Sequence, residues 1–369
     1  EELYTNFCLS LFFVYDNYVT ERIALRKIEG GWGWIIPFLL LVSLVSNILG
    51  LVLPFLEIKE AFHDKVIYSL PHSVHLMWQH QLYFIASLIL GFSIIFPFVK
   101  LFSLITLWFL PWKSNHRERY LHFIELLGKW SYMDIFIVIL LLSLTSNQSN
   151  IASTVHVGVY FFVGAITLSM ITSGIIMTLA RKQCQAESPP KKALRKRKWM
   201  LFDNIYLGWI VPVLIFASAI ALIESLNATF LRISQLFLVS RSYSINEIAA
   251  VLQEQKHWVL FIVLVSTIFI VPMLRLAILL VAWITPMREK LRVKVKQLID
   301  VLSRWCMLDV FGLALFLITT EGKDLVNTDI QPGLYVVVTA IGLSYLLGLI
   351  AIMLNKAMIA KSNQLTEVS

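Results

Sequence analysis

The sequence predicts an all-α membrane protein of about eight transmembrane helices, arranged as two tandem, parallel four-helix repeats with both termini in the cytoplasm. Three observations support this fold class. Of the 369 residues, 58% are hydrophobic and only 15% are charged, whereas soluble domains average roughly 45–50% apolar and about 25% charged residues. Apolar runs of membrane-spanning length recur along the chain. Distinctive residues also recur at one fixed spacing, which indicates an internal repeat.

The apolar runs are the predicted spans, because a helix needs roughly 20 apolar residues to cross the hydrocarbon core. Backbone groups in lipid must find partners within the segment, so runs this long favour helices over barrel strands. The expected spans are residues 34–56, 81–110, 131–149, 155–180, 207–226, 257–285, 306–320 and 333–357. The second and sixth runs exceed the bilayer and carry Pro97 and Pro272 near their middles. Kinked helices are expected there, because proline removes a backbone hydrogen bond.

The net charge of +8 comes from basic blocks between the apolar runs, chiefly in loops 111–130, 181–206 and 286–305. The positive-inside rule places these loops and both termini in the cytoplasm. Short basic blocks next to spans indicate anionic lipid, not nucleic acid, as the partner. In loop 286–305 apolar residues recur every three or four positions, as in an amphipathic helix. Such a helix fits the membrane interface, and a short soluble helix capping its neighbours is the alternative.

A shift of 175 residues aligns the two halves of the chain without a gap. The shift pairs Gly33-Trp34 with Gly208-Trp209, Pro37 with Pro212, Pro97 with Pro272, Lys100 with Arg275, Trp130 with Trp305, and Asp134 with Asp309. Rare residue types seldom match by chance at one offset. Four helices per copy give both copies the same orientation, which predicts a parallel repeat.

The repeat predicts the domain organisation. The expected parts are a cytoplasmic segment 1–30, a first four-helix domain 31–181, a basic linker 182–205, a second four-helix domain 206–357 and a cytoplasmic tail 358–369. The chain begins with Glu1-Glu2 instead of Met, which suggests an incomplete N-terminus.

Four ionisable residues are expected at membrane depth, where such groups are rare and are functional candidates by default. Lys100 and Arg275 each follow a kinking proline by three residues, and Asp134 and Asp309 lie near the starts of the third helices. We expect the ion pairs Lys100–Asp134 and Arg275–Asp309, because an opposite charge offsets part of the desolvation cost. Two roles stay open: a polar core that admits a lipid headgroup or a proton, and a structural pair that fixes helix register.

Several other residues complete the candidate set. Cys306 and Thr339 extend the polar network if they turn inward, although hydroxyls in membrane helices more often bond their own backbone. Trp130 and Trp305 are typical of interfacial anchors. The cysteine and histidine spacings predict no metal site. Neither a Walker loop, a nucleophile elbow nor an H-E-x-x-H motif occurs, so we expect neither an enzyme nor a cofactor.

Two short motifs occur once in each repeat. The first is Phe96-Pro97-Phe98-Val99-Lys100-Leu101, repeated as Val271-Pro272-Met273-Leu274-Arg275-Leu276. The second is Gly128-Lys129-Trp130-Ser131-Tyr132-Met133-Asp134, repeated as Ser303-Arg304-Trp305-Cys306-Met307-Leu308-Asp309. Together they resemble the signatures of the paraquat-inducible protein A family (PqiA/LetA), over about residues 30–180 and 205–357. Family members commonly carry a cysteine-rich zinc ribbon before each membrane domain. Here segments 1–30 and 182–204 hold one cysteine each, so no zinc ribbon is expected.

The resemblance implies a multi-pass protein of the bacterial inner membrane that works with periplasmic MCE-domain proteins. The implied role is the transfer of phospholipid between the inner membrane and such a partner. A proton- or ion-coupled small-molecule transporter is the alternative, with the Lys/Asp and Arg/Asp pairs as relay groups. A structural protein without transport activity is the third possibility.

Overall fold

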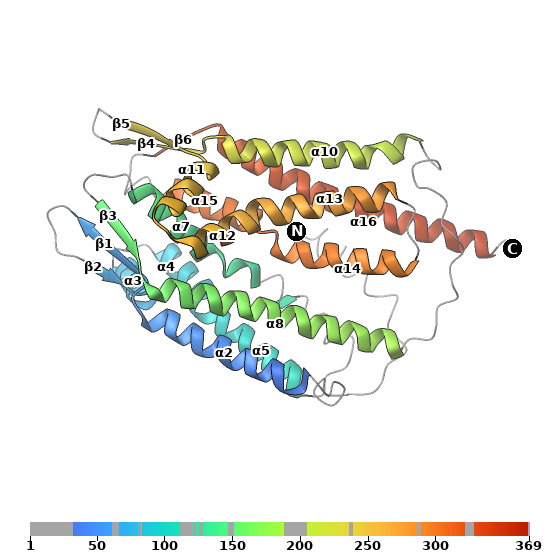
Figure 1. The fold of residues 1–369 in the computed structure, drawn as a ribbon, viewed down its shortest axis with the longest axis horizontal. Helices are drawn as coiled ribbons and strands as arrows, with labels where there is room; N and C mark the ends of the chain where they lie inside the picture. The colour runs from blue at the N-terminus through green and yellow to red at the C-terminus, as the bar shows by residue number, and fades with distance from the viewer. Residues whose placement is uncertain are drawn as a thin grey trace. The chain divides into compact units, whose positions relative to one another are not determined.

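The computed structural model describes residues 32–60, 66–79, 81, 83–110, 120, 123–124, 128–146, 151–187, 205–235, 239–285, 289–321 and 328–367. The expected N-terminal segment and residues 188–204 of the linker lie outside this part. Helices dominate the structure (Figure 1). The chain divides into two compact units, one of residues 1–58, 65–131 and 154–194, and one of residues 59–64, 132–153 and 195–369.

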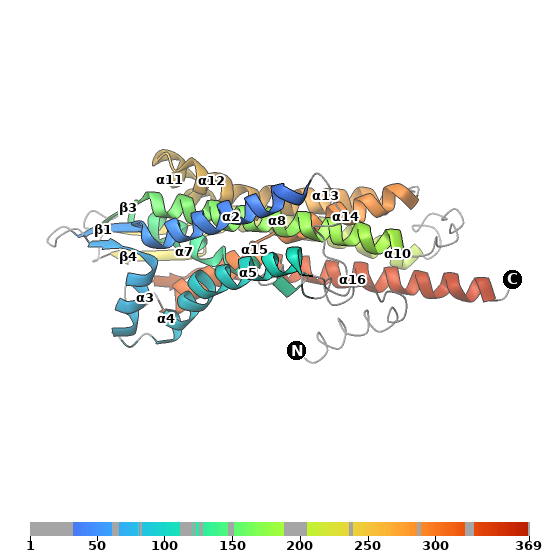
Figure 2. The same ribbon diagram turned by 90° about the horizontal axis from the view of Figure 1, so that it is seen from below.

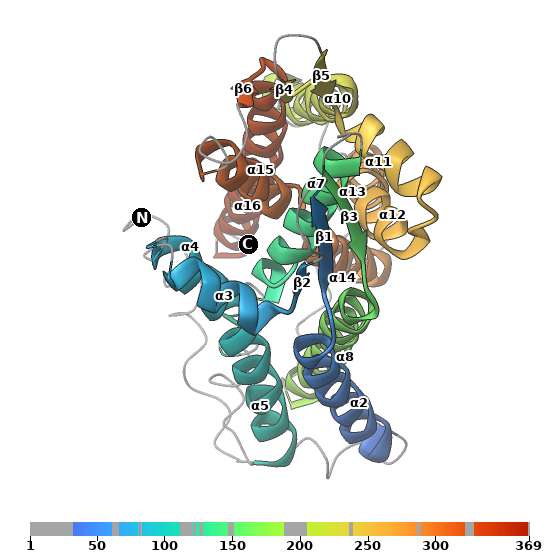
Figure 3. The same cartoon turned by 90° about the vertical axis from the view of Figure 1, so that its left-hand side faces the viewer.

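The first unit is built around three long helical stretches. Its helices are α2 (Trp32–Val52), α3 (Leu70–Gln79), α4 (Tyr83–Ile89), the π-helical turn η3 (Leu90–Ile95), α5 (Phe96–Phe109) and α8 (Val157–Glu187). α2 and α8 lie side by side (Figure 3). Buried side chains of α2, α5 and α8, among them Ile36, Leu104, Trp108 and Met177, form its apolar core.

The second unit contains the second repeat and one helix of the first. Its helices are α7 (Met133–Ser146), α10 (Ile205–Asn227), α11 (Ile245–Glu254), α12 (Trp258–Val265), the π-helical turn η4 (Ser266–Ile270), α13 (Val271–Ile284), α14 (Glu289–Trp305), α15 (Leu308–Glu321) and α16 (Gly333–Glu367). α7 packs against α15, where the rings of Phe136 and Phe311 meet edge to face at 5.6 Å. These two phenylalanines are equivalent in the 175-residue repeat, so the third helices of both copies meet in this unit.

Six short strands in the described chain correct the prediction of an all-α protein. β1 (Leu56–Glu60), β2 (Val66–Tyr68) and β3 (Ile151–Val155) form a sheet in the order β2-β1-β3. β4 (Leu231–Gln235), β5 (Val239–Tyr243) and β6 (Thr328–Ile330) form another in the order β5-β4-β6. In the second unit, β4 lies at the end of the helices away from the C-terminal end of α16 (Figure 2). Strands of three to five residues lie at or below the short end of the roughly four- to eight-residue range over which alternation indicates a strand.

Both sheets preserve the repeat in their register. Leu56 pairs with Tyr68 in one sheet, and Leu231 pairs with Tyr243 in the other. Each pair is the other shifted by 175 residues. The repeat is therefore structural as well as sequential.

Seven stretches of the described chain are helical, long and apolar enough to cross a membrane. They are Gly33–Val52, Ala86–Phe109, Val157–Ala180, Trp209–Asn227, Trp258–Ile284, Lys294–Thr319 and Gly333–Ile350. Exposed apolar side chains such as Phe38 and Ile262 cover these helices, which fits contact with lipid. The protein is thus a multi-pass membrane protein. The expected span 131–149 forms α7, whose 14 residues reach only about 21 Å, and an eighth crossing stays a prediction.

Each expected proline kink coincides with a change of helix type. η3 ends directly before α5, in which Pro97 is the second residue, and η4 ends directly before α13, in which Pro272 is the second residue. Proline lacks an N–H group and its ring crowds the preceding turn. A widened π turn is one way to accommodate this, and such turns are frequent at functional sites.

The amphipathic helix expected in loop 286–305 is α14. It runs back along α13 (Figure 1) instead of lying across the ends of the spanning helices. Leu302 is buried, while Leu291 and Leu298 are exposed. Only part of its apolar face is therefore used to pack against the bundle.

Candidate functional site

The two intramembrane basic residues make equivalent hydrogen bonds. Lys100 of α5 donates from Nζ to Ser169 Oγ of α8, over 3.0 Å. Arg275 of α13 donates from Nη1 to Ser344 Oγ of α16, over 3.1 Å. Both donors and both acceptors are related by the 175-residue shift. In each copy, the kinked second helix thus carries a cation that binds the fourth helix.

Lys100 occupies a tight, buried position. Its side chain is 2% exposed. A methyl group added at Gly128 would lie 2.9 Å from Lys100 Nζ, so the absence of a side chain at Gly128 makes room for the ammonium. Ser303 stands at the equivalent place in the second copy and donates to Ile299 of its own helix.

Asp309 and Arg275 do not form the expected ion pair. Asp309 Oδ2 accepts a hydrogen bond of 2.8 Å from the hydroxyl of Tyr345, the residue next to Ser344. The carboxylate and the guanidinium therefore bind neighbouring residues of α16 instead of each other. Asp134 is buried in the first turn of α7. Lys100 and Asp134 belong to different units, and their pairing stays a prediction.

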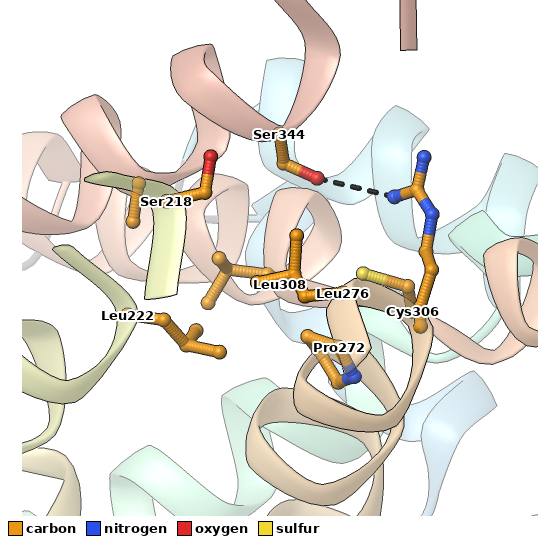
Figure 4. Close-up of a pocket in the computed structure, with 9 residues that line it drawn as sticks. Ser218, Leu222, Pro272, Leu276, Cys306, Leu308 and Ser344 are labelled. Atoms are coloured by element: carbon orange, nitrogen blue, oxygen red, sulfur yellow. Dashed lines mark hydrogen bonds between the residues drawn. The ribbon is translucent and has the colours of Figure 1, made fainter. Parts of the chain in front are cut away.

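A narrow, partly open cavity lies beside Arg275 in the second unit. Its lining comes from α10, α13, α15, α16 and the short break between α14 and α15 (Figure 4). The lining residues are Ser218, Leu222, Pro272, Arg275, Leu276, Cys306, Leu308, Ala340 and Ser344. Its wall is therefore mostly apolar, with one cation, two hydroxyls and one thiol.

The polar groups of this wall differ in how they are satisfied. Ser344 is held by Arg275. Ser218, 3% exposed, has no hydrogen-bond partner within the described chain. Cys306 is buried at the break before α15, where the N–H of Met307 donates to the carbonyl of Thr267 in η4 over 3.4 Å. The π-helical turn and the cavity wall are thus directly linked.

The remaining predicted residues lie outside the cavity. Thr339 is exposed, and its hydroxyl donates to the carbonyl of Tyr335 on the same helix. This is the backbone bond that competes with an inward orientation. Trp130 is half-buried and its ring lies 6.0 Å from that of Phe92. Trp305 is half-buried at the end of α14, and the anchor role of both tryptophans stays a prediction.

Sequence reasoning missed Ser218, Ser344 and Tyr345. Single serines in apolar helices carry no motif of their own. The repeat offset held the signal, since Ser218 is equivalent to Ser43, and Ser344 to Ser169. Tyr345 had no such signal, because Met170 stands at its equivalent position.

Comparison with known proteins gives a family match over most of the chain. A family model described as "Paraquat-inducible protein A" matches residues 36–179 and again residues 211–356. The chain is also similar to a "Probable intermembrane transport protein" of Haemophilus influenzae (strain ATCC 51907 / DSM 11121 / KW20 / Rd), with 29% identity over 96 residues. This match spans 25% of the chain and 23% of the relative. No solved structure matches the chain.

Proposed function

Because the chain belongs to the paraquat-inducible protein A family, and because it crosses the membrane several times, we propose that it is the inner-membrane component of an MCE-linked lipid transport system. In this role it passes phospholipid between the bacterial inner membrane and a periplasmic MCE-domain partner. It maintains the envelope without catalysing a reaction itself. The name of the Haemophilus relative, an intermembrane transport protein, supports a role in transport.

The observation that carries the proposal is the cavity beside Arg275. A phospholipid joins an anionic phosphate ester to apolar chains. The cavity likewise places a guanidinium among leucines, with Leu222, Leu276 and Leu308 on its wall. Guanidinium groups bind phosphate oxygens through charge-assisted hydrogen bonds. A headgroup phosphate could therefore be held at Arg275 while the apolar wall contacts the beginning of a chain.

The proposal is tested by purifying the tagged protein in a mild, phosphate-free detergent. Copurifying proteins and bound lipids are identified by mass spectrometry. We expect an MCE-domain partner and enriched phospholipid with the wild type. The matched variants are Arg275→Lys, which keeps the charge, and Arg275→Met, which removes it. Arg275→Met should retain the partner but lose most of the bound phospholipid. A wild-type protein that carries neither partner nor enriched phospholipid would contradict the proposal.

A second function, coupled transport of a small molecule, is favoured by one observation at Asp309. One carboxylate oxygen accepts from Tyr345, while the other is buried and has no hydrogen-bond partner within the described residues. The second oxygen is therefore available to bind a coupling ion during a transport cycle. Reconstitution in liposomes separates the two functions. Lipid transfer to a periplasmic partner supports the first, and pH-gradient-driven uptake of a soluble solute supports the second.

A further inference from the structure

The first and fourth helices of each repeat are fastened together at one end by identical contacts. The N–H of Gly158, near the start of α8, donates to the carbonyl of Pro54 over 3.0 Å. The N–H of Gly333, at the start of α16, donates to the carbonyl of Thr229, again over 3.0 Å. Both bonds are equivalent under the 175-residue shift. The two helix pairs therefore start from the same anchored geometry.

Beyond this anchor, the helix pair of the first unit stays closed. A methyl group added at Gly50 of α2 would lie 2.9 Å from the backbone nitrogen of Phe162 in α8, so the two backbones are in contact there. Two turns further along α2, Ser43 donates to the carbonyl of Ala165 over 2.9 Å. The missing side chain at Gly50 is what allows this approach.

The helix pair of the second unit differs at the same level. Ser225 of α10 stands where α2 has Gly50, and its hydroxyl is buried and donates to Leu222 of its own helix. A real Cβ essentially never comes as close to a neighbouring atom as the contact at Gly50 would require. α10 must therefore stand further from α16 at this level than α2 stands from α8.

The consequence is visible two turns along α10. Ser218 is equivalent to Ser43, and Ala340 is equivalent to Ala165. Instead of bonding to each other, both line the cavity, and the hydroxyl of Ser218 has no hydrogen-bond partner within the described chain. Figure 4 places Ser218 in the cavity that also contains Ser344. The Ser43 hydroxyl joins α2 to α8 in the first unit, whereas the equivalent hydroxyl of Ser218 is available to bind a ligand in the second unit.

We infer that Ser218 is a ligand-contacting residue of the second unit, and that Ser225 is the positioning residue that keeps it available by holding α10 away from α16. The ligand is a phosphate ester, because the same cavity supplies the guanidinium of Arg275 and the hydroxyl of Ser344. Ser218 donates a hydrogen bond to a phosphate oxygen, which gives the buried hydroxyl a partner that the described residues do not supply. This inference rests on the proposed function and adds two residues to its site.

Cys306 provides a native probe because it lines the cavity. Cys8 and Cys184 are the other cysteines of the chain and are replaced by serine. The full-length protein in maltoside detergent is treated with methyl methanethiosulfonate, and labelling of Cys306 is followed by intact mass. Dihexanoyl-phosphatidylglycerol, glycerol phosphate and the phosphate-free dihexanoylglycerol are then tested for protection. Protection by the first alone identifies a lipid headgroup, whereas equal protection by glycerol phosphate identifies a soluble phosphate ester.

Three variants test the two residues. Ser218→Ala should weaken protection by about tenfold, the effect of one hydrogen bond to a charged group. Ser225→Gly should weaken it as much, because α10 can then approach α16 as α2 approaches α8. Ser225→Ala retains the Cβ and should show the same protection as the wild type. This separates the effect of the Cβ from the loss of the serine hydroxyl. Ser43→Ala, which removes the equivalent hydroxyl of the first unit, should leave protection unchanged.

The outcomes separate this inference from the proposed function. Wild-type protection that is lost in Ser218→Ala and in Ser225→Gly supports both. Wild-type protection that is unchanged in these variants overturns the roles of Ser218 and Ser225 and leaves the proposed function standing. If Cys306 does not react, or if no phosphate ester protects it in the wild type, the cavity does not admit this ligand. That outcome overturns the inference together with the lipid site beside Arg275.

Discussion

Substitution of Gly333 by alanine should destabilise the second unit by separating α16 from the end of α10. An added Cβ would lie 2.6 Å from the carbonyl carbon of Thr229, against an ordinary contact distance of 3.4 Å. The carbonyl oxygen of Thr229 would lie closer still, so the backbone would have to withdraw by more than about 0.8 Å, which also strains the hydrogen bond from Gly333 to Thr229. Overpacking costs about 1–3 kcal/mol, and the lost bond adds about 1 kcal/mol. The expected total is about 2–4 kcal/mol.

The matched control lies on the same helix. Gly342 has no atom within 4 Å of an added Cβ, so Gly342→Ala should be neutral or stabilising by up to about 1 kcal/mol. Thermal unfolding of both variants in detergent is followed by tryptophan fluorescence. We expect Tm to fall on the order of 5–10 °C for Gly333→Ala and not to fall for Gly342→Ala. Equal Tm values for Gly333→Ala and the wild type would refute the argument from backbone contact.

Three further predictions concern polar groups. Gly128→Ala should lower the free energy of unfolding by less than about 1 kcal/mol, because the added methyl meets the flexible end of Lys100 and not backbone. A Tm drop as large as that of Gly333→Ala would contradict this. Asp309→Asn should abolish transport in a reconstituted assay while the protein still inserts, and Tyr345→Phe, which removes the hydrogen bond to that carboxylate, should reduce transport less. Full activity of Asp309→Asn would rule out a functional role for the carboxylate. Burial lowers the pKa of His257 below its usual value near 6.5. The neutral imidazole therefore contributes to the stability of the fold above pH 6.5. This contribution to stability is lost as the pH falls through the lowered pKa. His257→Gln should therefore show a smaller drop in Tm between pH 7 and pH 5 than the wild type, and an unchanged drop would show that burial of this imidazole is not responsible.

The repeat and the intramembrane positions of Lys100 and Arg275 could be predicted from the sequence, because both are marked by residue types that are rare in apolar helices. Prolines, tryptophans and charges at membrane depth are conspicuous in an apolar chain, and their 175-residue spacing carries over into the strand register. Arg275, which was singled out as an ionisable group at membrane depth, is half-buried and lines the cavity. The family match over residues 36–179 and 211–356 confirms the resemblance drawn from the two short motifs.

Other features depend on distances that no local pattern records. Ser43 is hydrogen-bonded, whereas Ser218 has no partner among the described residues. We attribute this difference to the presence or absence of a Cβ seven residues away, at Gly50 or Ser225. Asp309 accepts a hydrogen bond from Tyr345 of α16, the residue next to Ser344, instead of pairing with Arg275 as expected. The strands were missed because three to five residues in a polar loop give too short a pattern.

The π-helical turns also alter the geometry of everything that follows them along the helix. A π turn holds one more residue than an α turn, and each residue of an α-helix advances by about 100°. A helical wheel drawn through residues 258–284 as one α-helix would therefore rotate Arg275 by about 100° from its true side. In a scanning mutagenesis of this helix, a period measured before Ser266 does not continue after Ile270. The two halves have separate faces, and only the second defines the face that lies toward the cavity.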